Sequence, residues 1–223
     1  MWLLEELNLP YEVRVYKRNR DFRGPDELNK IHPLGKSPVI EIITSSGERK
    51  VIAESGHICS YMMRHYDKEN KLGGDNEDVD YFLHYTEGSF QWLHVGLLIN
   101  DFAGQTVPWG ISHFLHGLLG IINSHYYIPE VYKNLQFLEN RLEKQHKENS
   151  EYFVGNKLTA ADIILSYPVA NFYIDPEVSR RIFGRKFDAR EKYPNLYRWY
   201  QFIQKNPNLI KANQSITNLG VKL

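Results

Sequence analysis

Two short stretches of the sequence combine residue types that could hold a peptide-like ligand. The first is His32-Pro-Leu-Gly-Lys-Ser-Pro38, in which Pro38 begins an apolar, strand-like run. A cis bond before Pro38 would kink the chain and turn the backbone N–H and C=O of Ser37 outward, where an extended peptide could pair with them. A trans proline at the first residue of an edge strand fits this stretch equally well.

The second stretch is Ala53-Glu-Ser-Gly56, at the expected junction between a strand and a helix. The N-terminus of a helix has unpaired N–H groups and a partial positive charge, and both favour a carboxylate. Ser55 could cap this helix and still donate its hydroxyl, while Glu54 could accept from an ammonium group. The pair therefore suits the α-amino acid end of a ligand, although a serine cap beside a glutamate is usually only a cap.

The elements expected between the two stretches would position them together. The alternation predicts strands over 39–43 and 49–53, joined by the Thr44-Ser-Ser-Gly47 turn, and a helix over 55–66. Such a hairpin would bring the start of the first strand and the start of the helix to the same end of the sheet.

The rest of the chain divides into an α/β part and a helical part. Before the hairpin we expect a helix over 1–8, a strand over 11–16 and a short helix over 25–31. Residues 67–78 are charged and contain glycine, which is typical of an interdomain linker. We therefore predict domains at 1–66 and 79–223, the second helical almost throughout.

Composition excludes several classes of function. The 27 basic residues balance 27 acidic ones, so we expect no nucleic-acid partner. Cys59 is the only cysteine, which excludes an intrachain disulfide, a CxxC pair and a cysteine-based zinc site. The residues around it, Gly-His-Ile-Cys-Ser-Tyr, favour a packing role over the alternative of a nucleophile. His113 and His116 are three residues apart, which could place them on one helix face, but they have no carboxylates nearby, so we expect no metal site.

The sequence contains no recognisable signal peptide and no apolar run long enough to span a membrane. We therefore expect a soluble cytoplasmic protein, with peripheral association with an organelle membrane as an alternative.

A capping box is predicted at Thr159-Ala-Ala-Asp162. Thr159 would cap a helix, and Asp162 would reach back to the backbone of Thr159. Because apolar residues 163–165 follow, this helix should lie in the core of the second domain. We assign Thr159 and Asp162 a role in folding only.

Four stretches together resemble the cytosolic glutathione transferases, and most closely the fungal Gtt1-like branch. They are Leu-Pro-Tyr-Glu (9–12), the stretches 32–38 and 53–56 above, and Gly-Asn-Lys-Leu-Thr-Ala-Ala-Asp (155–162). The resemblance implies a thioredoxin-like N-terminal domain followed by an all-helical C-terminal domain, usually in a homodimer. It also implies that Pro38 is a cis-proline, that Ser37 offers its backbone to the cysteinyl part of glutathione, and that Glu54 and Ser55 hold the γ-glutamyl end.

The remaining roles implied by the resemblance are less specific. Lys36, and less directly Arg23, would face the glycyl carboxylate of glutathione, whereas each could also be a solvated surface charge. The aromatic residues of the helix expected over 79–100 should be core or dimer contacts, and residues near them would line an apolar pocket for a hydrophobic electrophile.

One part of the family pattern has no counterpart in this sequence. In the family, a first strand precedes the helix found here at residues 1–8, and a Tyr, Ser or Cys after that strand stabilises the glutathione thiolate. No residue of this chain maps to that role, so the catalytic residue is unknown. Our hypothesis is an N-terminally incomplete version of a normal transferase; the rival is a genuine short form that binds without catalysing.

These observations predict a glutathione transferase that conjugates the glutathione thiolate to electrophiles in detoxification. Glutathione is the expected co-substrate, and glutathione peroxidase activity is a possible side reaction. The alternative is a catalytically impaired module of the same fold that binds or assembles with partners, as in translation factors.

Overall fold

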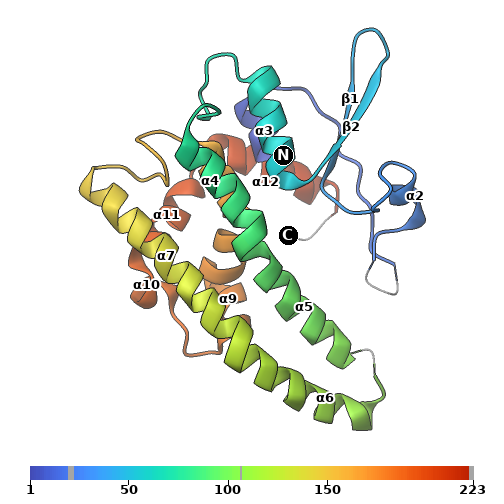
Figure 1. The fold of residues 1–223 in the computed structure, drawn as a ribbon, viewed down its shortest axis with the longest axis vertical. Helices are drawn as coiled ribbons and strands as arrows, with labels where there is room; N and C mark the ends of the chain where they lie inside the picture. The colour runs from blue at the N-terminus through green and yellow to red at the C-terminus, as the bar shows by residue number, and fades with distance from the viewer. Residues whose placement is uncertain (20–22, 106, 221–223) are drawn as a thin grey trace. The chain divides into compact units, whose positions relative to one another are not determined.

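The computed structural model describes residues 1–19, 23–105 and 107–220 (Figure 1). The chain forms two compact units. The first comprises Met1–Asp75 together with Lys205–Leu223, and the second comprises Asn76–Gln204. The first is a mixed α/β unit and the second is helical, which confirms the fold class predicted from the sequence.

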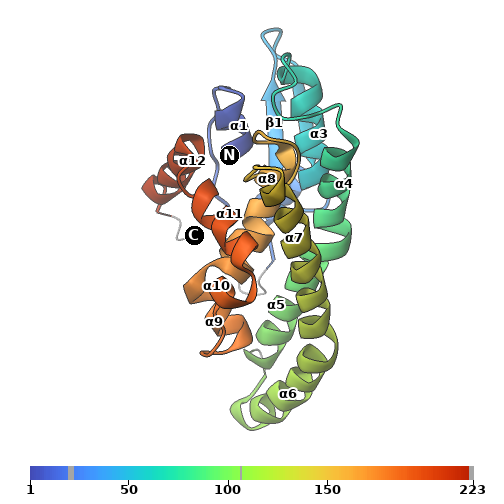
Figure 2. The same cartoon turned by 90° about the vertical axis from the view of Figure 1, so that its left-hand side faces the viewer.

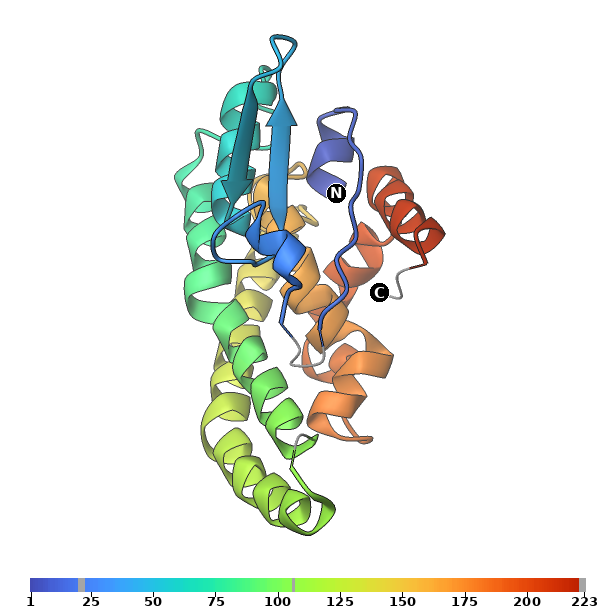
Figure 3. The same ribbon diagram turned by 90° about the vertical axis from the view of Figure 1, so that its right-hand side faces the viewer.

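A β-hairpin and the helix after it form the centre of the first unit. Strands β1 (Val39–Ile43) and β2 (Arg49–Ala53) are antiparallel, with pairs running from Val39↔Ala53 to Ile43↔Arg49 (Figure 3). Helix α3 (Ser55–Tyr66) follows β2 after one residue and buries its apolar side. All three elements have the bounds predicted from the sequence.

The strand predicted over residues 11–16 does not form, so this prediction is wrong. In the described residues the sheet contains only β1 and β2. Burial alternates only at the start of the segment, where Tyr11 and Val13 are half-buried and Glu12 and Arg14 are exposed; Val15 is exposed as well. The guanidinium of Arg14 lies 4.0 Å from the carboxylate of Glu41 in β1. A strand requires a backbone ladder, and alternation alone does not supply the partner.

Three helices complete the first unit: α1 (Trp2–Glu6), α2 (Asp26–Asn29, after Pro25) and α12 (Pro207–Asn218). Helix α1 packs against α12 (Figure 2). The buried carboxylate of Glu5 joins them, accepting from the Tyr11 hydroxyl and the Lys211 ammonium, both at 2.5 Å. The C-terminal helix, expected in the helical domain, therefore belongs to the compact unit of residues 1–75.

The second unit is a series of helices, several of them continuous through π-helical turns. In chain order they are α4 (Glu77–Tyr85), η1 (Thr86–Gln91), α5 (Trp92–Gln105), α6 (Trp109–Ile122), η2 (Asn123–Tyr127), α7 (Ile128–Lys147), α8 (Ala160–Leu165), η3 (Ser166–Ile174), α9 (Pro176–Phe183), α10 (Ala189–Lys192) and α11 (Pro194–Ile203). No helix in the described part of the chain is long and apolar enough to cross a membrane.

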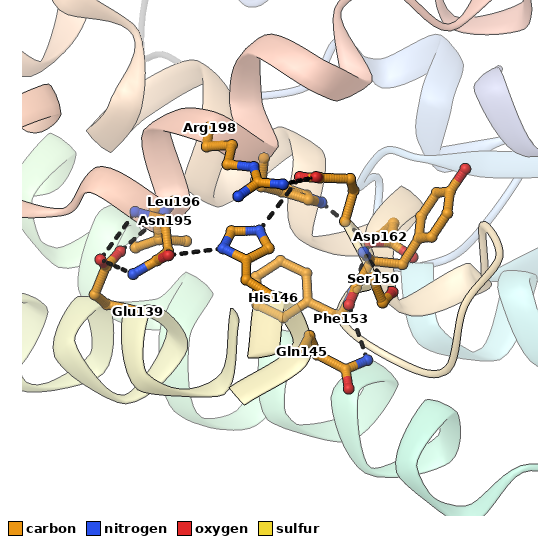
Figure 4. A network of polar contacts seen from close by, with 12 residues as sticks. Glu139, Gln145, His146, Ser150, Phe153, Asp162, Asn195, Leu196 and Arg198 are labelled. Atoms are coloured by element: carbon orange, nitrogen blue, oxygen red, sulfur yellow. Dashed lines mark hydrogen bonds and ion pairs between the residues drawn. The ribbon is translucent and has the colours of Figure 1, made fainter. Parts of the chain in front are cut away.

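The core of the second unit is organised around the carboxylate of Asp162. Thr159 and Asp162 form the predicted capping box at the start of α8, whose residues are all buried. The carboxylate also accepts from the Phe153 backbone N–H and from Trp199 Nε1, both at 3.0 Å (Figure 4). Burial raises the pKa of Asp162 to about 6, and these donors oppose that shift.

A second carboxylate caps helix α11 in the same unit. Glu139 of α7 is buried and accepts from the backbone N–H groups of Asn195 and Leu196 and from the Asn195 side-chain amide, at 2.7–2.9 Å (Figure 4). Pro194 occupies the first position of this helix and has no N–H to satisfy. Glu139 therefore supplies the acceptor that the helix N-terminus requires.

Candidate functional site

The two stretches singled out from the sequence meet at the base of the hairpin. The peptide bond between Ser37 and Pro38 is cis, as expected. Pro38 directly precedes β1 and Glu54 directly follows β2, and the pair Val39↔Ala53 joins the two strands at that point. The register therefore places Ser37 and Pro38 beside Glu54 and Ser55, which confirms the juxtaposition expected from the sequence.

Glu54 has an unusual backbone conformation at this junction. Its φ of 68° and ψ of 122° lie in a region that residues with a side chain rarely adopt, and holding it there costs of order 1–3 kcal/mol. Its carbonyl accepts the first helical hydrogen bond, from Ile58 N at 2.8 Å. Its side chain is exposed. This conformation starts α3 and points the acidic residue away from the core.

The predicted cap of α3 by Ser55 is wrong. Glu54 is the N-cap and Ser55 is the first helical residue. Among the described residues, no side chain caps the N-terminus of this helix. The helix begins one residue earlier than a serine cap would allow because the Glu54 carbonyl already accepts from Ile58. The first turn of α3 thus keeps N–H donors directed at the same end of the hairpin as Ser37.

Lys36 and Arg23, the two cations of the predicted site, lie on neighbouring backbone segments. A Cβ on Gly24 would lie 2.5 Å from the Gly35 carbonyl oxygen, so the segment after Arg23 packs directly on the turn before Lys36. Gly35 has a φ of +55° and lies against Asn29, which leaves no room for a side chain. Both Lys36 and Arg23 are exposed, and neither forms an ion pair with a described residue. Sequence reasoning missed these two glycines, although a glycine beside each cation was the available signal.

These residues can bind a ligand with several charges. The bare N-terminus of α3 and the two cations favour carboxylates, the exposed Glu54 favours an ammonium group, and the Ser37 backbone can pair with an extended peptide. Cys59, one turn into α3, is buried and suits a packing role. Among the described residues, no three His, Cys, Asp or Glu side chains converge as metal ligands would.

Thr159 and Asp162 lie in the second unit. Their groups bond to one another and to the core, in accordance with the structural role predicted for them.

Comparison with known proteins identifies the family. The model of the glutathione S-transferase N-terminal domain matches residues 1–65, and that of the C-terminal domain matches residues 126–207. Glutathione S-transferase 1 of Saccharomyces cerevisiae is 34% identical to this chain over 99% of its length and 91% of the yeast protein. The chain belongs to the glutathione S-transferase family. Its first unit is accordingly the thioredoxin-like domain of that family, with two strands in the described residues, and its second unit is the helical domain.

Solved glutathione S-transferases have the same fold. Ure2p5 from Phanerochaete chrysosporium, crystallised with 1-(S-glutathionyl)-2,4-dinitrobenzene, has a TM-score of 0.70 and 20% identity, covering 98% of this chain and 88% of that one. A glutathione transferase homologue from Lodderomyces elongisporus, with two glutathione molecules per subunit, has a TM-score of 0.68 and 23% identity, covering 94% and 89%. Elongation factor 1-gamma 3 of rice is 24% identical over 93% of this chain and 42% of its own length.

Proposed function

We propose that this glutathione S-transferase binds glutathione at the base of the hairpin and conjugates its thiolate to hydrophobic electrophiles. The observation that carries the proposal is the pairing of Val39 with Ala53, which brings the cis Ser37–Pro38 peptide beside Glu54 and the first turn of α3. Glutathione-bound relatives of the same fold support it.

Each part of glutathione has a chemically matched partner in this arrangement. The N–H and C=O of Ser37 pair with the cysteinyl residue as one strand pairs with another. The γ-glutamyl end carries an ammonium group, which suits Glu54, and a carboxylate, which suits Ser55 and the N-terminus of α3. Lys36 and Arg23 face the glycyl carboxylate.

Conjugation requires the thiolate of glutathione at neutral pH. The thiolate sulfur forms a bond to the electrophilic carbon, and the leaving group departs with the electron pair of the bond that breaks. Holding the tripeptide at three points lowers the entropy cost of this attack. We assign the stabilisation of the thiolate to no residue of the described site. In the peroxidase side activity, the same thiolate attacks a peroxide oxygen, the O–O bond breaks and an alcohol leaves; a second glutathione then displaces water from the resulting sulfenic acid to give the disulfide.

Neutralising Glu54 tests the site. In Glu54→Gln, we expect the affinity for glutathione, measured by titration calorimetry, to fall about 10- to 100-fold, because one charged hydrogen bond contributes roughly 1.5–3 kcal/mol. Glu48→Gln is the matched control, since Glu48 is exposed in the turn at the other end of the hairpin. Equal affinities for the parent and Glu54→Gln would remove Glu54 from the site.

The similarity to rice elongation factor 1-gamma 3 favours a second candidate, a non-catalytic binding or assembly module. Conjugation of 1-chloro-2,4-dinitrobenzene distinguishes the two. Turnover that depends on glutathione and is lost in Glu54→Gln supports the transferase, whereas glutathione binding without turnover supports the module.

A homodimer is also part of this proposal. Helices α5 and α6 expose large apolar side chains, and between residues 95 and 126 the only charged residue is Asp101. The exposed set is Trp92, Val95, Leu98, Ile99, Ile111, Phe114, Leu118, Ile121 and Ile122. Those of α6 recur at spacings of three and four and share a face. An apolar face with so little charge suits an interface between copies of the chain, so a second copy is the occupant we propose.

The dimer is tested by a charge on this face. Phe114 is 76% exposed, so Phe114→Glu should leave the monomer folded and convert a dimer to a monomer in sedimentation equilibrium. Ile43→Glu, at the exposed end of β1, is the control and should remain dimeric. A monomeric parent protein at micromolar concentration would contradict the dimer and leave the glutathione site untouched.

A further inference from the structure

Three buried side chains of the helical unit, those of His94, Tyr173 and Ser179, carry polar atoms that no described residue satisfies, and the rings of the first two are neighbours. His94 of α5 is 6% exposed and Tyr173 of η3 is fully buried. The two ring nitrogens of His94 have no hydrogen-bond partner within the described chain, and the hydroxyl of Tyr173 has none either. More than nine in ten buried polar groups in proteins are satisfied, so three such atoms on neighbouring rings require a cause.

The surroundings of the two rings are aromatic. The His94 ring lies 3.7 Å from the Phe172 ring and 6.0 Å from the Tyr173 ring, centroid to centroid, the latter nearly perpendicular. Phe90 and Phe183 contact Tyr173 at 5.3 and 5.7 Å. These rings keep bulk water away from the three polar atoms, and no charged side chain contacts either ring among the described interactions.

Both groups are neutral at physiological pH. Burial lowers the pKa of His94 to about 4 and raises the pKa of Tyr173 well above its usual range. The pair therefore offers one imidazole N–H donor, one imidazole nitrogen acceptor and one hydroxyl that can donate or accept. This set matches a neutral partner that both donates and accepts.

The backbone around the pair is also uncommon. Tyr173 lies within the π-helical segment η3, and His94 follows shortly after the π-helical segment η1. Such turns are rare and occur frequently at functional sites, because they redirect side chains that a regular helix would place elsewhere. Two of them adjoin the unsatisfied pair.

We propose that His94 and Tyr173 form an internal binding site for one neutral hydroxyl group. The hydroxyl donates to the unprotonated nitrogen of His94 and accepts from the O–H of Tyr173. The ring centroids of the two side chains lie 6.0 Å apart, and a hydroxyl oxygen can donate one hydrogen bond and accept another. The hydroxyl belongs to a water molecule or to a small phenol; an ion does not fit, because nothing at the site compensates a charge. The inference is independent of the glutathione site.

A double-mutant cycle on the full chain tests the site. His94→Phe and Tyr173→Phe each remove one partner of the hydroxyl and keep the ring, so each should lower the folding equilibrium constant in urea about 5- to 10-fold. The double variant should lose little more stability than either single variant, because both side chains bind the same hydroxyl. At pH 7, where His94 is neutral in both the folded and the unfolded state, additive losses of stability or a gain in stability in His94→Phe would overturn the proposal, because a dry pair gains when an unpaired polar ring becomes apolar.

Two further variants separate hydrogen bonding from packing. His94→Gln keeps a donor and an acceptor, so it should retain the coupling with Tyr173→Phe even if His94→Phe fails to fold; an additive cycle there contradicts the site. Tyr85→Phe is the matched control, since the Tyr85 hydroxyl donates to Asn134 at 2.7 Å, and its cycle with His94→Phe should be additive.

Phenol distinguishes the two sources of the hydroxyl. If the site admits phenol, millimolar phenol should raise the melting temperature of the parent and leave His94→Phe unchanged. A coupled cycle without any effect of phenol identifies the hydroxyl as water.

Discussion

The base of the hairpin and the core around Asp162 are both marked by short polar motifs, and they differ in how their polar groups are used. Asp162 is fully buried, and the surrounding donors are directed at its carboxylate. Glu54 is exposed, has a strained backbone, and precedes a helix whose first N–H groups have no side-chain acceptor in the part of the chain that the structure describes. A closed network stabilises a fold, whereas open donors and acceptors gathered at one place on the surface leave hydrogen bonds for a ligand.

The largest effect that this comparison predicts concerns stability. Asp162→Ala should lower the free energy of unfolding by about 3–5 kcal/mol, because it leaves buried donors of Thr159, Phe153 and Trp199 unpaired. Urea denaturation measures the loss. A change below 1 kcal/mol would mean that this network does not hold the core together.

The sequence predicted both regions, with different success. The capping box and the hairpin follow from local rules, so their residues were predicted with the right bounds. The cis bond at Pro38 did not follow from local sequence, because a trans proline fits the same residues. The positive φ of Glu54 carries no signal in a residue other than glycine, and this is why the cap was assigned to Ser55. The strand at 11–16 failed because pairing depends on a partner elsewhere.

The next effect is pH-dependent and lies in the helical unit. The pKa of His94 is lowered to about 4 in the folded state, so the unfolded state binds more protons between pH 6.5 and 4 and stability falls as pH falls through this window. Asp162, whose pKa is raised, changes stability in the opposite direction. Relative to the parent, His94→Phe should therefore gain roughly 3 kcal/mol between pH 6.5 and pH 4. If the free energies of unfolding of the parent and of His94→Phe changed in parallel with pH, His94 would not be buried and neutral in the folded state.

A smaller effect concerns the strain at the hairpin base. Glu54→Gly should raise the free energy of unfolding by up to ~1 kcal/mol, because glycine adopts a positive φ without steric cost. The same change should weaken glutathione binding. Thermal melting and calorimetry on one preparation give both values, and a loss of both stability and binding would place Glu54 among the structural residues.

The smallest effect concerns the cations. Lys36→Ala should weaken glutathione binding only a few-fold, because exposed charge pairs contribute ~0.2–1 kcal/mol, and the difference should shrink as salt rises. Lys50→Ala, exposed in β2, is the control. A loss of glutathione affinity above 10-fold that does not depend on salt would mean that Lys36 becomes buried against the ligand.

A glutathione titration followed by the backbone amide signals of the ¹⁵N-labelled protein shows directly whether glutathione binds at the base of the hairpin. We predict saturable shifts at Ser37, Glu54, Ser55 and Gly56, with the amides of Phe153 and Thr159 unchanged. Saturable binding that leaves the first four amides unmoved would show that glutathione binds elsewhere and would contradict the account.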